Sequence, residues 1–209
     1  MRFDLLHPSD QLAMLMERIY AYGMTTTSGG NLSIRDEDGA VWITPSGVDK
    51  GSLTRDDMIR VRPDGGVDGK HRPSVELPFH LSVYRRRPDI RAILHAHPPG
   101  IVAFSIVRRL PDIRLIPNIS LICGEIAMAP YALPGSEQLG ENIAVEFDRG
   151  RSTVVLENHG VVIGTGSLFD CFMAFETLES CARLQINALR LGAALHPLDD
   201  RRIDISRRK

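Results

Sequence analysis

The chain has 209 residues, of which 43% are hydrophobic and 24% charged, as expected for a globular protein with a buried core. Basic and acidic residues number 25 and 26, so the net charge of −1 gives no electrostatic reason to expect nucleic acid or a membrane surface as a partner. No apolar run is long enough for a membrane-spanning helix, and the N-terminal residues lack the apolar core of a signal peptide. These features predict a cytoplasmic protein with a single domain over residues 1–209.

The three cysteines, Cys123, Cys171 and Cys181, are an odd number at wide spacings. Neither a disulfide framework nor a zinc–thiolate site fits that pattern. We therefore expect reduced, buried thiols.

The first third of the sequence predicts one helix followed by short antiparallel strands. Ser9 or Asp10 could cap a helix that runs to about Tyr22, where apolar residues recur at helical spacing. Thr54 and Asp57 indicate a capping box that opens one helical turn. The strands are expected at 32–35, 41–44 and 58–62.

Two loops rich in glycine and hydroxyl groups interrupt this region, at 25–31 and 44–48. Such loops present backbone N–H groups and small polar side chains, which can form a concave site for an anion. The alternative is that each loop is an ordinary turn.

The middle of the chain predicts a helix followed by a strand. Ser74 is a plausible N-cap for a helix ending near Arg87, which would place Glu76 in its first turn. Interaction with the helix dipole is by itself a sufficient explanation for Glu76 there. His80, one turn further on among apolar residues, is interpreted as a packing or surface residue.

Two histidines at the end of the next strand suggest a metal site. Side chains alternate across a strand, so His95 and His97 point to the same face. Two imidazoles on one face of a rigid element suit a divalent transition metal. The alternative is a strand end that carries two surface histidines.

The second half predicts alternating helices and strands, with an irregular apolar segment at 114–122. Helices are expected over 98–108, 138–147 and 168–194, and strands over 126–129, 152–156 and 161–165. The basic tail, 195–209, is interpreted as mobile or as an oligomer contact.

A catalytic zinc site uses three protein ligands and leaves one position open. The best candidate for the third ligand is His159, in a tight turn between two strands. The remaining candidates are weaker, because His7 and His196 lie near the termini and His71 lies in a loop. Glu76 could serve as a fourth ligand or as a general base.

Five motifs occur in the order and at the intervals of the class II aldolase/adducin-head family, and the chain resembles that family from about residue 12 to 192. They are Ser28-Gly-Gly-Asn-Leu-Ser33, Ile43-Thr-Pro-Ser-Gly47, Pro73-Ser-Val-Glu76, His95-Ala-His97 and Asn158-His-Gly160. The family includes L-fuculose-phosphate aldolase and L-ribulose-phosphate 4-epimerase. The resemblance implies an α/β class fold: one α/β/α domain with a central, largely antiparallel sheet. It also implies a homotetramer with sites at subunit interfaces.

Matched residue by residue, the resemblance implies that His95, His97 and His159 bind Zn²⁺ or another divalent metal. Glu76 matches the carboxylate that binds the resting metal and acts as acid and base during turnover. The matches to the family's phosphate pocket are Ser28, Gly29, Asn31, Ser46, Gly47 and Ser74.

The activity implied is a zinc-dependent aldolase reaction. It would cleave a small sugar 1-phosphate, similar to L-fuculose 1-phosphate, to dihydroxyacetone phosphate and an aldehyde through a metal-stabilised enediolate. The alternatives are an epimerase, dehydratase or decarboxylase that shares the metal–enolate step, and a non-enzymatic, adducin-like scaffold.

Three departures from L-fuculose-phosphate aldolase affect the substrate end of the site. Val75 stands where that enzyme has a serine that helps to hold phosphate. The segment 117–122 lacks the tyrosine that handles the aldehyde half of the substrate, and no tyrosine follows Tyr131. The resemblance is therefore more complete for the metal site than for the aldehyde site.

Overall fold

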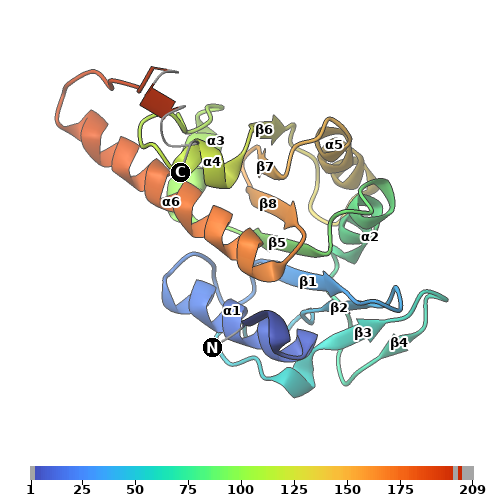
Figure 1. Ribbon diagram of the computed structural model, residues 1–209. Coiled ribbons are helices and arrows are strands. Elements are labelled where there is room, and N and C mark those ends of the chain that lie inside the picture. The colour runs from blue at the N-terminus through green and yellow to red at the C-terminus, as the bar shows by residue number, and fades with distance from the viewer. Residues whose placement is uncertain (1–2, 200–201, 204–209) are drawn as a thin grey trace.

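The computed structural model describes residues 3–199 and 202–203, which include one eight-stranded sheet with helices on both faces (Figure 1). The strands are β1 (Asn31–Arg35), β2 (Val41–Ile43), β3 (Ile59–Val61), β4 (Val67–Asp68), β5 (Ala92–Ala96), β6 (Ile126–Ala129), β7 (Thr153–Leu156) and β8 (Gly160–Thr165). Their order in the sheet is β4-β3-β2-β1-β5-β8-β7-β6. Every neighbouring pair is antiparallel except β6 and β7, which are parallel. The predicted α/β class with a largely antiparallel sheet is confirmed.

The α-helices are α1 (Pro8–Ala21), α2 (Leu77–Arg86), α3 (Pro99–Ile106), α4 (Ile119–Cys123), α5 (Glu137–Asp148) and α6 (Leu168–Arg190), and the 3-10 helices are η1 (Phe3–Leu5) and η2 (Arg55–Asp57). Helices α1, α3, α4 and α6 pack on one face of the sheet, and α2 and α5 pack together on the other (Figure 1). This arrangement is the predicted α/β/α layering.

The central strand β5 is buried on both faces, which explains its continuous apolar sequence. Leu94 lies in the core under α1 and α6, whereas Ile93 lies in the core under α2 and α5. Its neighbour β8 is divided in the same way, with Ile163 in the first core and Val162 in the second. The two strands that reach the candidate site are therefore held by packing on both sides.

Two helices begin at residues other than those expected. His7, not Ser9 or Asp10, is the N-cap of α1, and its Nδ1 accepts a hydrogen bond from the Ser9 N–H at 3.3 Å. Glu76 is the N-cap of α2, so the expected cap at Ser74 was wrong. Pro73 forms a bridge with Pro45, and residues 75–76 then form a turn in which the Leu77 N–H donates to the Ser74 carbonyl at 3.0 Å, so the helix begins only after this turn.

Several smaller features differ from the sequence-based expectations or confirm them. The segment expected to be irregular contains the short helix α4, and the two-residue strand β4 was not foreseen. The capping box of Thr54 and Asp57 is confirmed, and the three cysteines are free and buried. Within the described ranges, no helix is long and apolar enough to cross a membrane.

Only 195–199 and 202–203 of the predicted tail are described, and the rest of 195–209 lies outside the described residues. In the described part, the Leu198 N–H donates to the Arg114 carbonyl at 3.0 Å. The single domain over 1–209 stays a prediction.

A buried carboxylate from α6 holds the start of α3, which follows shortly after β5 and His97. Glu179 is 1% exposed, and its two oxygens accept hydrogen bonds from the Gly100 and Ile101 N–H groups, each at 2.9 Å. Arg183 donates to the same carboxylate at 2.5 Å. Free N–H groups at a helix start favour a negative partner, so Glu179 fixes α3 relative to α6.

We expect Glu179→Gln to lower the free energy of unfolding by about 2–3 kcal/mol, because an amide can accept from only one of the two N–H groups and loses the charge. For a chain of this length the melting temperature should fall by roughly 5–10 °C, which calorimetry would measure. The control is Glu176→Gln, one turn earlier on α6. An equal loss in both variants would contradict the capping role.

Candidate metal centre and active site

His95 is fully buried in β5 and is oriented by the neighbouring strand. Its Nδ1 donates a hydrogen bond to the Val161 carbonyl at 3.0 Å. A backbone acceptor at Nδ1 fixes the tautomer of the ring and leaves the Nε2 lone pair available. Nε2 is 3.2 Å from Glu76 Oε2 and 3.1 Å from His97 Nε2.

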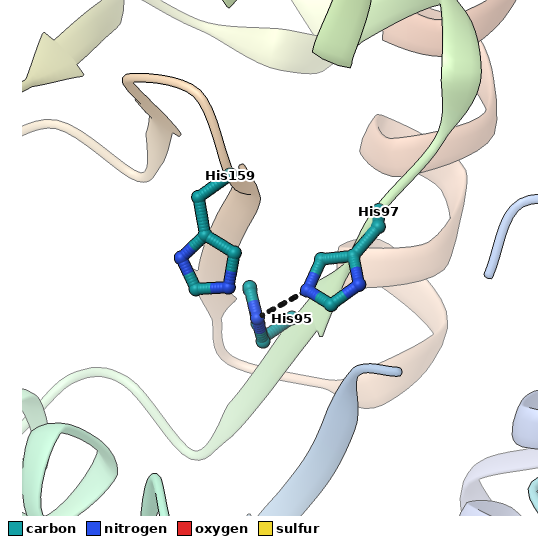
Figure 2. A group of neighbouring side chains, drawn as sticks. All are labelled: His95, His97 and His159. Atoms are coloured by element: carbon teal, nitrogen blue, oxygen red, sulfur yellow. Dashed lines mark hydrogen bonds between the residues drawn. The ribbon is translucent and has the colours of Figure 1, made fainter. Parts of the chain in front are cut away.

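His97 and His159 complete a group of three converging imidazoles (Figure 2). His97 lies just beyond the end of β5, and His159 lies in the turn between β7 and β8. One ring nitrogen from each of the three histidines lies within 4.8 Å of the others. The predicted convergence of these side chains is confirmed, whereas their role as metal ligands stays a prediction.

The turn that presents His159 depends on its two neighbours. Asn158 has a φ of 55°, a left-handed conformation that asparagine tolerates better than most residues. A side chain at Gly160 would collide with the Ala96 carbonyl oxygen and the His97 ring. The Asn158-His-Gly160 motif therefore brings His159 close to the end of β5.

Glu76 points its carboxylate at this histidine group. It is 6% exposed, its Oε1 lies 3.9 Å from His159 Nε2, and Asn31 Nδ2 donates to its Oε2 at 2.7 Å. Burial raises the pKa of Glu76, but His95, Asn31 and His159 together outweigh it and hold the pKa below its usual range. Burial also lowers the pKa of His95, but the interaction with Glu76 outweighs burial, so the pKa of His95 is raised.

The other two imidazoles are held neutral. Burial, with the nearby His95, lowers the pKa of His97 to about 3 and that of His159 to about 4. A neutral imidazole keeps a nitrogen lone pair, which is the form that binds a metal.

This donor set fits a divalent metal on the evidence of its unpaired atoms. Glu76 Oε1, which faces the histidines, is buried with no hydrogen-bond partner among the described residues. His159 Nδ1 is also unpaired, but it is Nε2 of that ring that faces Glu76, at 3.9 Å. Leaving such atoms unpaired is costly unless a ligand completes them. Three imidazole nitrogens with one carboxylate are a ligand set that Zn²⁺ accepts, and other divalent metals are compatible.

A second layer of hydrogen bonds, which the sequence did not reveal, supports Glu76. Neutral His80 is fully buried, and burial lowers its pKa to about 3. Its Nε2 donates to Asn31 Oδ1 at 2.5 Å, which turns the Asn31 amide so that Nδ2 faces Glu76. Ser33 Oγ then donates to His80 Nδ1 at 2.6 Å, and the Tyr84 hydroxyl donates to Ser33 at 2.8 Å.

The interpretation of His80 as a packing or surface residue was therefore incomplete, because it also orients a site residue. Its position four residues after Glu76, on the following helical turn, was the available signal.

The predicted phosphate residues line a cavity of about 410 Å³ beside the histidines. Its walls come from the loops around 26–31 and 45–50 and from the segment 74–76. All six predicted residues lie there: Ser28, Gly29, Asn31, Ser46, Gly47 and Ser74. Glu76, His97 and His159 share this cavity, whereas His95 is covered by its neighbours.

The first loop must approach β5 closely. Gly30 has a φ of 72°, and a Cβ there would lie 2.7 Å from the His95 carbonyl oxygen. Only glycine allows that contact and that conformation. The cavity lining also includes Lys50, which the sequence analysis did not single out.

Comparison with known proteins places these residues in a wider group. The family model described as Class II Aldolase and Adducin N-terminal domain matches residues 10–186. The chain is 31% identical over 183 residues to a 3-oxo-tetronate 4-phosphate decarboxylase of Haemophilus influenzae, covering 86% of this chain and 87% of that protein. It is 32% identical over 186 residues to a 5-deoxy-D-ribulose 1-phosphate aldolase of Bacillus thuringiensis, covering 88% and 86%.

A solved structure of an L-fuculose 1-phosphate aldolase has the same fold, with a TM-score of 0.83 and 30% identity. The match covers 95% of this chain and 93% of that one. These three relatives are named for different activities, and each name specifies a phosphorylated sugar or sugar acid as the substrate.

Proposed function

Because this chain belongs to the class II aldolase and adducin family, we propose that it is a metal-dependent aldolase acting on a small sugar 1-phosphate. Its products would be dihydroxyacetone phosphate and an aldehyde. The observation that carries the proposal is the buried Glu76 carboxylate, 3.2 Å from His95 Nε2 and facing a group of three convergent histidines. The phosphorylated substrates in the relatives' names support the substrate class.

His95, His97 and His159, with Glu76, would hold the metal, which we propose to be Zn²⁺. When bound, a divalent ion stabilises the negative charge that develops on substrate oxygens as a carbon–carbon bond breaks. The protein's contribution is to fix these side chains through the Val161 carbonyl and the packing of β5 and β8.

Glu76 would move a proton at the carbon next to the substrate carbonyl. Its carboxylate is ionised in the free protein, so it can accept a proton, and its oxygen without a partner is free to reach the substrate. Asn31, oriented by His80, would keep the other oxygen in place. The predicted residues of the two loops and Ser74 would bind the phosphate and so set its distance from the metal.

A decarboxylase is the second candidate, favoured by the 31% identity to the Haemophilus influenzae protein. Loss of carbon dioxide from a 3-oxo acid leaves negative charge at the same position as aldol cleavage, so both reactions can use Glu76 and the histidines. A non-enzymatic scaffold has less support, because it would not require three neutral or paired histidines beside a carboxylate.

The homotetramer also stays a prediction. Large apolar side chains are exposed at the mouth of the cavity or in the segment leading to it, with Val75 67%, Tyr131 57% and Leu133 68% exposed. A second subunit that covers them would bury apolar surface next to the site.

Product analysis on three phosphorylated substrates tests the proposal. The panel is L-fuculose 1-phosphate, 5-deoxy-D-ribulose 1-phosphate and 3-oxo-tetronate 4-phosphate, assayed for dihydroxyacetone phosphate and for carbon dioxide. We expect dihydroxyacetone phosphate from at least one of the ketose 1-phosphates. Release of carbon dioxide without dihydroxyacetone phosphate would overturn the aldolase assignment in favour of the decarboxylase.

The same panel after chelation tests the metal. Activity should disappear and return when Zn²⁺ is added. Cleavage at the untreated rate, in protein shown to be free of metal, would overturn the metal-dependent mechanism.

A further inference from the structure

Lys50 is a buried lysine without a negative partner among the residues that the structure describes. It is 3% exposed, and its Nζ donates a hydrogen bond of 2.5 Å to the Pro45 carbonyl. No carboxylate forms an ion pair with Lys50 in the part of the chain that the structure describes. An ammonium group taken out of water without a counter-charge is costly, so its retention requires an explanation.

Lys50 lines the candidate active-site cavity at its phosphate end. Its backbone N–H donates to the Thr27 carbonyl at 2.9 Å, and its side chain bonds to Pro45, so it contacts both glycine-rich loops. Among the residues that line this cavity, all of them described, it is the only lysine or arginine. The other groups at this end are neutral hydroxyls, amides and backbone N–H groups.

The charge state of Lys50 depends on what enters the cavity. Burial lowers its pKa to about 8, so near neutral pH the ammonium form predominates but is weakly held. The other titratable side chains that line the cavity are Glu76, His97 and His159, at the metal end. An anion bound between the two loops would supply the missing counter-charge.

We propose that Lys50 is a substrate-binding residue whose ammonium group contacts the phosphate dianion, adding a cationic contact to a phosphate site of neutral donors. This inference rests on the proposed function only for the identity of the substrate. The binding of an anion at Lys50 does not depend on that function. Lys50 would also make the site prefer dianionic substrates to uncharged ones, because a positive charge strengthens the binding only of the charged form.

A purely structural role is the competing explanation, in which Lys50 only joins the two loops. That role requires a hydrogen-bond donor to Pro45 and does not require a free positive charge. A test must therefore separate the charge from the hydrogen bond.

The direct test measures anion contact by NMR on the unmodified protein, with lysine labelled with ¹³C at Cε. The sequence contains only Lys50, Lys70 and Lys209, so few signals arise, and Lys50→Met identifies the one of interest. With inorganic phosphate as the probe, we expect the Lys50 signal to move and its titration midpoint to rise above that of the free protein. The exposed Lys70 should not respond. An unchanged Lys50 signal would overturn the inference, whether or not phosphate perturbs the loop amides.

The kinetic test compares Lys50→Gln, which keeps a donor for Pro45 but removes the charge, with Lys50→Arg, which keeps the charge. We expect Lys50→Gln to raise KM for the ketose phosphate about 10–100-fold with a smaller change in kcat, as for loss of a charged hydrogen bond. Lys50→Arg should recover most of the affinity, and Lys70→Gln should match the unmodified enzyme. On the unphosphorylated ketose, Lys50→Gln should lose much less activity than on the ketose phosphate.

Equal losses on both substrates would show that Lys50 is structural and would overturn the inference. Failure of the proposed function would look different. The unmodified enzyme would then cleave no sugar phosphate, and the NMR response to phosphate would still decide the role of Lys50.

Discussion

Replacing Glu76 by glutamine should reduce turnover by about 10²–10⁴-fold, the usual contribution of a general acid–base residue. Glutamine has nearly the same shape and can still accept the Asn31 hydrogen bond, which now measures 2.7 Å to Oε2. The amide cannot, however, exchange a proton with the substrate. The measurements are kcat with a ketose phosphate, metal content by elemental analysis and the melting temperature.

The fold and the metal should survive this change, because three imidazoles remain. Glu137→Gln, on the exposed first turn of α5, is the matched control and should have normal turnover. Near-normal activity of Glu76→Gln with its metal in place would refute the assigned role.

Replacing His97 by alanine should remove the metal and, with it, all measurable cleavage. The variant would keep only His95, His159 and Glu76 around the metal, so the site loses one of its three imidazole donors. The loss of metal affinity should therefore exceed the roughly 10–100-fold that follows from changing a residue behind a ligand. Elemental analysis after dialysis measures the metal directly.

The control for this experiment is His196→Ala, at an exposed position outside the histidine group. It should keep the metal content of the unmodified protein. Stoichiometric metal retained by His97→Ala would contradict the proposed site, and activity restored by modest added Zn²⁺ would mean that His97 is not required as a ligand.

Local sequence rules predicted the residue types of the site well. The alternation of side chains along a strand put His95 and His97 on one face, and the residues beside His159 indicated a constrained turn. The structure confirms that the three rings converge. The glycine-rich loops were also recognisable, because their composition implies close approach and positive φ angles, which Gly30 has.

Local rules were weaker for features that depend on contacts between distant segments. The start of α2 was misplaced because a turn at 75–76 precedes it, after Pro73 has paired with Pro45, which is far away in the sequence. The sequence indicated only a packing or surface role for His80, because its partner Asn31 lies 49 positions away. Composition also gave no reason to single out Lys50, since a lysine is usually exposed.

The sequence by itself therefore determined the family and the histidines of the candidate metal centre, because these follow from the order and spacing of motifs along the chain, and the resemblance to the family implied the fold class. The tertiary structure decided which groups are buried and what faces them. It brought Glu76 to 3.2 Å from His95, ordered Asn31 through His80 and placed the charge of Lys50 in the cavity. The physical reason is that burial, and the pairing of charges it demands, arise only when separate segments pack together.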